Sequence, residues 1–166
     1  KTFGKRGGIV MRNPVSNDEL KASVLFNASM VNPTTIMRLE SLKKTGFQYA
    51  KGLKYCEDLD FWTRAVRVFK LNTIPKILLL YRTHDDQATH RDETFQLSLR
   101  DSIFQKQLNF LDMSEDDPKR LIYSQIRTFG TECENADFLK TAESWFKEII
   151  FLNDQKKVYG DKFLKY

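Results

Sequence analysis

The sequence predicts an α+β, helix-rich fold, and two observations support this class. Up to about residue 90, short apolar segments rich in β-branched residues alternate with helical patterns. Beyond Thr89 the patterns are helical only. We therefore expect two parts, residues 1–90 with a few strands and residues 91–166 as a helical extension. A length of 166 residues suits one domain, or a compact half-domain with an added helical unit.

The chain opens with a basic, glycine-rich stretch, residues 1–8, which predicts a loop leading to a short strand at Ile9–Met11. Ser16 and Glu19 have the spacing of a capping box, so a helix is expected over about Asp18–Ala28. The pair at 32–33, Asn-Pro, should end it.

Thr34–Met37 is short and β-branched, which predicts a second strand. A small helix over Leu39–Thr45 should end at Gly46, in the left-handed position that glycine favours. Phe47–Tyr55 is expected to be a loop that leads to an acidic cluster.

A helix from Asp58 to Phe69 follows from apolar residues that recur every three or four positions. The apolar run Ile77–Tyr81 then predicts a strand covered on both faces, with Pro75 near its start.

Three helices are expected in the second part. The stripe of the first is Leu97, Phe104, Leu108 and Leu111. The second begins at about 114–118 and closes near Phe129. The third spans about Ala136–Leu152, and Asn153 is expected to interrupt it before a last amphipathic piece.

Composition excludes several classes. Apolar residues make up 41% of the chain, which argues against extensive disorder. The net charge of +5 is interspersed rather than gathered in a stripe, so nucleic acid is not an expected partner. The basic excess leaves open an attraction to phosphorylated substrates or to an anionic membrane surface. No apolar run is long enough for a membrane span and no signal peptide is visible.

The two cysteines, Cys56 and Cys133, form neither a disulfide framework nor a metal site on their own. We expect free thiols in a reducing cytoplasm. Acidic neighbours should raise the pKa of Cys56, which argues against a thiolate nucleophile there.

The acidic cluster contains Glu57, Asp58 and Asp60, at the start of a predicted helix. Unpaired amides and the positive end of the helix dipole meet carboxylates there, so Asp58 is expected to be ionised and fixed, as a general base must be. The alternative is a helix cap with no further role.

Three motifs together resemble the second half of family 2 glycosyltransferases with the GT-A fold. They are Pro-Thr-Thr-Ile-Met-Arg at 33–38, Cys-Glu-Asp-Leu-Asp-Phe-Trp-Thr-Arg at 56–64, and Ile-Leu-Leu-Leu-Tyr-Arg-Thr-His at 77–84. The helical tail is similar to tails on capsule and lipopolysaccharide transferases. The resemblance covers most of the chain from about Asn13.

This resemblance implies an inverting transfer from a nucleotide-diphospho-sugar to the hydroxyl of a saccharide or lipid-linked acceptor. Asp58 matches the catalytic base of the family's "xED" motif. Glu57 would orient the loop or contact the acceptor, and Asp60 would do the same or be solvated. Trp62 is a substrate-binding candidate, although its spacing favours a core position.

The resemblance also implies a divalent metal, Mg²⁺ or Mn²⁺, in the complete enzyme. His84 matches the histidine that completes the metal site in many such enzymes, with Asp85 and Asp86 beside it. The alternative for His84 is a polar loop histidine. Arg82 could meet a phosphate or be plain surface.

The chain departs from the family by lacking the nucleotide-binding half and its Asp-x-Asp motif. Because it also begins at Lys1, it reads as a fragment, for which we expect no turnover and no bound metal. The absence of a Gln-x-x-Arg-Trp motif favours single-sugar addition over polymerisation.

A second hypothesis is a non-catalytic helical interaction module that docks a partner protein or a membrane surface. Two further expectations are a cytoplasmic location, at or near the inner face of the membrane, and self-association of the fragment through the face left by the missing half.

Overall fold

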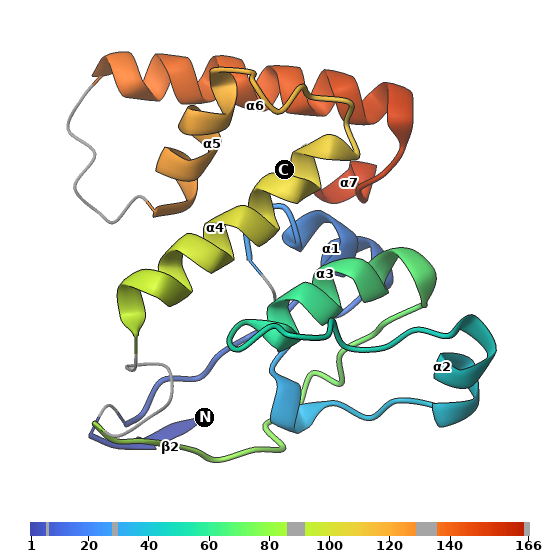
Figure 1. Ribbon diagram of the computed structural model, residues 1–166. Helices are drawn as coiled ribbons and strands as arrows, with labels where there is room; N and C mark the ends of the chain where they lie inside the picture. The colour runs from blue at the N-terminus through green and yellow to red at the C-terminus, as the bar shows by residue number, and fades with distance from the viewer. Residues whose placement is uncertain (6, 28–29, 86–91, 129–135, 165–166) are drawn as a thin grey trace.

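The structure is a computed structural model that describes residues 1–5, 7–27, 30–85, 92–128 and 136–164, without the side chains of Lys162 and Phe163. It is helix-rich, with two short strands in the described part, so the predicted α+β class is confirmed. In Figure 1, α6 crosses the top of the molecule and the two strands lie at its base, with α4 running diagonally between them. No helix in the described part has the length and apolarity needed to cross a membrane.

The helices of the first part lie close to their expected positions. α1 spans Asn17–Ser23, α2 spans Leu39–Thr45 and α3 spans Glu57–Val68. The predicted capping box is confirmed, because the Glu19 amide donates to the Ser16 hydroxyl while the Ser16 amide donates to the Glu19 carboxylate. Gly46 closes α2 with a φ of 65°, also as expected.

α1 is shorter than predicted because its last turn loosens at Ser23. The Ser23 hydroxyl donates to the Leu20 carbonyl at 2.8 Å, and residues 24–26 form a turn. Ala28, the predicted end, lies outside the described residues.

The strands differ from the predictions. β1 (Thr2–Gly4) pairs in parallel with β2 (Tyr81–Thr83). Ile9–Met11 is not a strand, because the chain turns back after β1 so that the Thr2 amide donates to the Ile9 carbonyl at 2.8 Å. In place of a strand at Thr34–Met37, the chain forms the 3₁₀ turn η1 (Asn32–Thr34), held by the Thr34 hydroxyl on the Val31 carbonyl.

The prediction that Ile77–Tyr81 is a strand covered on both faces is wrong. The strand begins only at Tyr81, and Ile77, Leu78 and Leu80 have 57%, 70% and 66% of their surface exposed. The two-stranded sheet is too small to extend to this segment or to cover it. The uncoiled trace that enters β2 is visible at the base of Figure 1.

The helical part follows as α4 (Glu93–Asn109), α5 (Lys119–Thr128), α6 (Ala136–Lys156) and α7 (Asp161–Leu164). The predicted stripe of α4 holds at Phe104 and Leu108, whereas Leu97 is 54% exposed. The expected end of α5 at Phe129–Gly130 lies outside the described residues.

The expected interruption at Asn153 is wrong, because α6 continues to Lys156. Asn153 is instead buried: its amide nitrogen donates to the Tyr159 carbonyl and to Asp161, and its carbonyl accepts from the Tyr159 amide. The side chain therefore closes the turn that follows the helix.

The main hydrophobic core joins both parts of the chain. Val24, Leu25 and Leu59 from the first 90 residues pack in the same cluster as Phe104 and Trp145. A smaller cluster of Phe61, Trp62 and Ala65 lies on another side of α3, with Phe47 and Phe69 against it. α3 thus separates two apolar regions, and its orientation is fixed from both sides.

Candidate functional site

The first turn of α3 carries the three carboxylates of the acidic cluster. The helix begins after Cys56, whose φ of 58° is left-handed and whose side chain makes no cap. The Asp58 Oδ1 accepts the Leu59 amide at 2.7 Å. Its Oδ2 accepts no hydrogen bond from any described residue, so one oxygen is held in place and the other is available. The first-turn position expected for Asp58 is confirmed.

A large groove runs along one side of α3. Its volume is about 1040 Å³, and Phe61, Trp62, Ala65 and Phe69 of this helix form one wall. Asp58 is three or four residues before Phe61 and Trp62 and seven before Ala65, so the helical period places it on the same face as that wall. Asp58 is half-buried and lies one turn before the lining begins. Asp58 itself is not among the residues that line the groove.

The residue before the acidic cluster is a poor nucleophile. Burial raises the pKa of the Cys56 thiol, with smaller contributions from Asp58 and Glu57 and an opposing one from Arg100. The Cys56 Sγ donates weakly to the Gln96 carbonyl, 3.8 Å away in α4. The expected direction is confirmed, although burial rather than the acidic neighbours is its main cause.

The entrance to α3 is tied to the start of α4. The Tyr55 hydroxyl donates to the Asp92 carboxylate at 2.7 Å, and the Lys54 Nζ lies 3.6 Å from it. The hydrogen bond from Tyr55 and the charge of Lys54 lower the pKa of Asp92. The ring of Phe95 packs edge-on against Tyr55. These contacts hold the loop that positions Asp58.

The other two carboxylates of the cluster differ from Asp58. Glu57 is exposed, and its role toward an acceptor stays a prediction. The Asp60 carboxylate is only 16% exposed and is paired with the Arg64 guanidinium at 2.7 Å. Arg64 also donates to the Gln48 carbonyl at 3.1 Å. Asp60 is thus neither solvated nor free, and it anchors the loop before α3.

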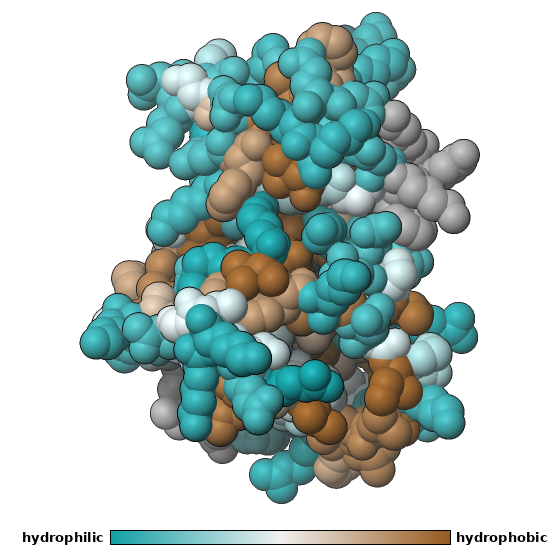
Figure 2. Space-filling model, turned by 90° about the vertical axis from the view of Figure 1, so that its right-hand side faces the viewer, coloured by the Kyte–Doolittle hydropathy of each residue, from teal (hydrophilic) through white to brown (hydrophobic). Residues whose placement is uncertain are grey.

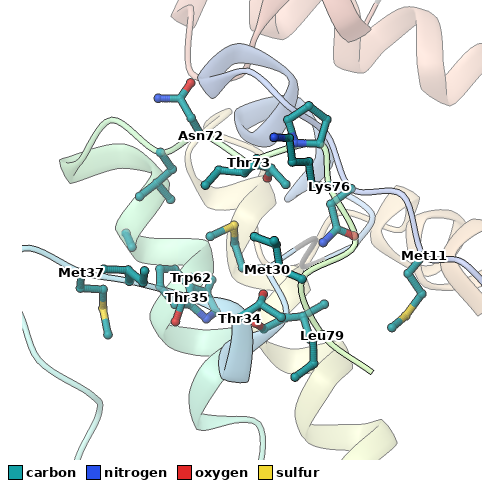
Figure 3. A pocket seen from close by; sticks show the side chains of 18 of the residues that line it. Met11, Met30, Thr34, Thr35, Met37, Trp62, Asn72, Thr73, Lys76 and Leu79 are labelled. Atoms are coloured by element: carbon teal, nitrogen blue, oxygen red, sulfur yellow. Dashed lines mark hydrogen bonds between the residues drawn. The ribbon is translucent and has the colours of Figure 1, made fainter. Parts of the chain in front are cut away.

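Trp62 is 2% exposed and belongs to the smaller core cluster, while part of it lines the groove (Figure 3). Its Nε1 is buried and has no hydrogen-bond partner among the described residues. A buried indole N–H normally finds an acceptor, so the Trp62 side chain lacks a hydrogen bond that this group usually makes.

The His motif lies apart from the acidic cluster. Arg82 is an exposed residue of β2, and His84 follows the strand half-buried. Asp85 is paired with Lys5 at 2.7 Å, and Asp86 lies outside the described residues. In Figure 1, β2 lies at the lower left, away from the start of α3.

The described residues contain no complete metal site. Among the described residues, no three His, Cys, Asp or Glu side chains gather where they could hold an ion. His84 as a metal ligand therefore stays a prediction.

Sequence reasoning missed the groove itself. Three methionines, Met11, Met30 and Met37, reach it from separate segments (Figure 3). Its lining includes residues of Ile9–Met11, predicted as a short strand, and of Ile77–Tyr81, predicted as a strand covered on both faces. One sequence feature could have pointed to the groove: the chain has several apolar, strand-like segments but too few predicted strands for all of them to pair in a sheet.

Comparison with known proteins gives one match of note. Over 101 residues the chain is 28% identical to an uncharacterized glycosyltransferase of Haemophilus influenzae; the matched region is 58% of this chain and 31% of that protein. The chain thus spans about a third of the length of this relative. No family model matches the chain, and no solved structure matches it. What the comparisons support is similarity to a glycosyltransferase.

Proposed function

We propose that this chain is the acceptor-side part of a glycosyltransferase of family 2 with a GT-A fold. The proposed reaction moves a sugar from a nucleotide-diphospho-sugar to an acceptor hydroxyl with inversion, in the synthesis of a surface polysaccharide or lipopolysaccharide. Two lines of support agree: the similarity to the Haemophilus influenzae glycosyltransferase, and the motifs that resemble that family.

The observation that carries the proposal is the geometry of Asp58. One carboxylate oxygen is held by the Leu59 amide at 2.7 Å, and the other accepts nothing from the described residues. A fixed carboxylate with one free oxygen can accept the proton of an alcohol as that alcohol attacks the anomeric carbon. In the transfer, the new bond forms between the acceptor oxygen and the anomeric carbon. The bond to the nucleoside diphosphate breaks with its electron pair on the phosphate oxygen.

The surrounding residues have supporting roles in this proposal. Glu57, which is exposed beside Asp58, would contact the acceptor. The pair between Asp60 and Arg64 and the bond from Tyr55 to Asp92 fix the loop on which Asp58 depends. A base that moves by about 1 Å can lose 10²-fold in rate, so these anchors matter for the chemistry.

The test compares Asp58→Asn with the unchanged protein, in the product of the complete reading frame that contains these residues. Transfer from radiolabelled nucleotide-diphospho-sugars to lipid-linked saccharide extracts is measured. Loss of a general base lowers kcat by about 10²–10⁴-fold. Glu40→Gln, an exposed first-turn carboxylate of α2 outside the groove, is the matched control and should stay within about twofold.

If Asp58→Asn retained most of the transfer rate while the control behaved as expected, Asp58 would not be the base. If no nucleotide-sugar were turned over by the unchanged protein, the enzymatic proposal as a whole would fail. The 166-residue chain alone is expected to show no transfer.

A further inference from the structure

The groove beside α3 has an unusual combination of surfaces. Its walls are largely apolar, yet several of those apolar residues are exposed: Ile36 at 99%, Ile74 at 62%, and Leu78 at 70%. Figure 2 shows hydrophobic side chains at the surface in the lower half of the molecule, the level at which the strands and α2 lie. Exposed apolar surface of this extent marks an interaction site.

The segment that enters β2 is not itself assigned as a strand, but its last residues continue the backbone pairing of β2 with the start of β1. The Tyr81 amide donates to the Lys1 carbonyl, and the Leu79 carbonyl accepts from the chain's terminal amine, so residues 79 and 81 direct their backbone groups toward β1. Because successive residues of a strand alternate between its two edges, Leu78 and Leu80 direct theirs to the other edge. No described residue bonds to the amides of Leu78 and Leu80.

The unpaired backbone groups along this edge favour a polypeptide ligand, which can hydrogen-bond to them, over a purely apolar ligand, which cannot. Four consecutive apolar residues, 77–80, are typical of a strand covered on both faces. An added strand would pair with the free amides and carbonyls of Leu78 and Leu80 while its side chains enter the groove.

The charge of the residues that line the groove indicates which kind of polypeptide segment would bind there. The cationic side chains that line it are Lys1, Arg12, Arg38, Lys70 and Lys76, and its described lining includes no Asp or Glu. None of these five pairs with a carboxylate of a described residue. The complement is therefore a segment that carries carboxylates.

A second copy of the chain fits this surface poorly. In a two-fold dimer the same patch meets itself, which would bring two sets of five cations together with no carboxylate between them. Like charges across an interface oppose association.

We propose that the groove and the adjoining edge at 77–80 bind an extended polypeptide segment in which apolar and acidic residues alternate. The segment adds a strand beside Leu78 and Leu80, inserts its apolar side chains among the methionines, and pairs its carboxylates with Lys70 and Lys76 at the rim. This binding role is separate from the proposed chemistry of Asp58.

The test uses the intact chain and two fluorescein-labelled, blocked eight-residue peptides, one alternating valine with glutamate and one alternating valine with lysine. Fluorescence anisotropy measures affinity, and amide hydrogen exchange locates the contact. The glutamate peptide should bind and protect the amides of residues 76–80, and the lysine peptide should bind at least about tenfold more weakly.

Two pairs of variants separate charge from backbone pairing. Lys70→Glu with Lys76→Glu should weaken the glutamate peptide about tenfold, whereas the matched double reversal Lys43→Glu with Lys44→Glu, on α2 outside the groove, should not. Leu78→Pro should abolish the protection, while Leu78→Ala, which keeps the amide, should retain it. Circular dichroism checks that each variant is folded.

Equal binding of the two peptides, or binding of neither, overturns the proposal. So does sedimentation as a dimer that protects residues 76–80, since the occupant would then be a second copy. Binding to phosphatidylglycerol vesicles without binding to the glutamate peptide would assign the groove to lipid and also overturn it.

Discussion

Asn153 provides the sharpest test of how the helical part is held. The side chain is 1% exposed and makes three hydrogen bonds, of which two satisfy the backbone amide and carbonyl of Tyr159, a residue that is 3% exposed. Asn153→Ala removes all three. Because the Tyr159 backbone groups stay buried without partners, each costs about 1–3 kcal/mol, whereas the partly exposed Asp161 can regain water.

Alanine also has a higher helix propensity than asparagine, which offsets about 0.5 kcal/mol. We therefore expect the free energy of unfolding to fall by about 1.5–5.5 kcal/mol, and the melting temperature to fall by roughly 3–20 °C for a chain of this size. Urea unfolding followed by circular dichroism measures the first quantity, and thermal unfolding measures the second.

The matched control is Gln155→Ala, an exposed position two residues further along α6, which should change stability by less than about 0.5 kcal/mol. A loss below about 1 kcal/mol for Asn153→Ala would refute the reasoning, because it would mean that the turn after α6 relaxes at little cost or that water replaces the side chain.

Two further predictions concern pH and packing. Burial raises the pKa of both Tyr123 and Tyr159. As pH rises, the unfolded chain therefore loses its phenolic protons first, and the free energy of unfolding should fall above about pH 10 by up to about 1.4 kcal/mol per pH unit for each tyrosine. Tyr123→Phe should reduce this slope by about half, as measured by urea unfolding between pH 8 and 11. An unchanged slope would contradict the argument. Gly160→Ala should lower the free energy of unfolding by about 1–3 kcal/mol, because the added Cβ would lie 2.2 Å from the Asp18 carbonyl oxygen. Its control is Ser144→Ala, on the exposed face of α6. If Gly160→Ala were as stable as the unchanged chain, the tight contact at Asp18 would be ruled out.

The sequence could predict the helices because their signals are local. The capping box at Ser16 and the glycine at 46 each fix a boundary within one turn of chain, and both are confirmed. Strands depend on partners that a local pattern does not contain. Ile77–Tyr81 has the composition of a buried strand, yet the short sheet at its end leaves it exposed.

The candidate site follows the same division. The position of Asp58 in the first turn could be predicted because it depends on the helix that it begins. Asp60 and Arg64 are four residues apart on one helix, so their pairing is also a local contact. Whether the Asp60 carboxylate is paired or solvated, however, depends on the burial of the pair beside the loop at Gln48. The groove could not be predicted, because its walls come from segments far apart in the chain.

The contact between α1 and α7 has a consequence for biosynthesis. These helices pack together with Gly160 against the Asp18 backbone, so α1 is covered by a helix that lies far from it in the sequence. Residues near 20 leave the ribosome well before residues near 160 are made, and domains fold as units once their elements are available. The nascent chain therefore carries the apolar face of α1 without the cover of α7 until the residues near 160 have left the ribosome, and during this interval a chaperone would protect that face.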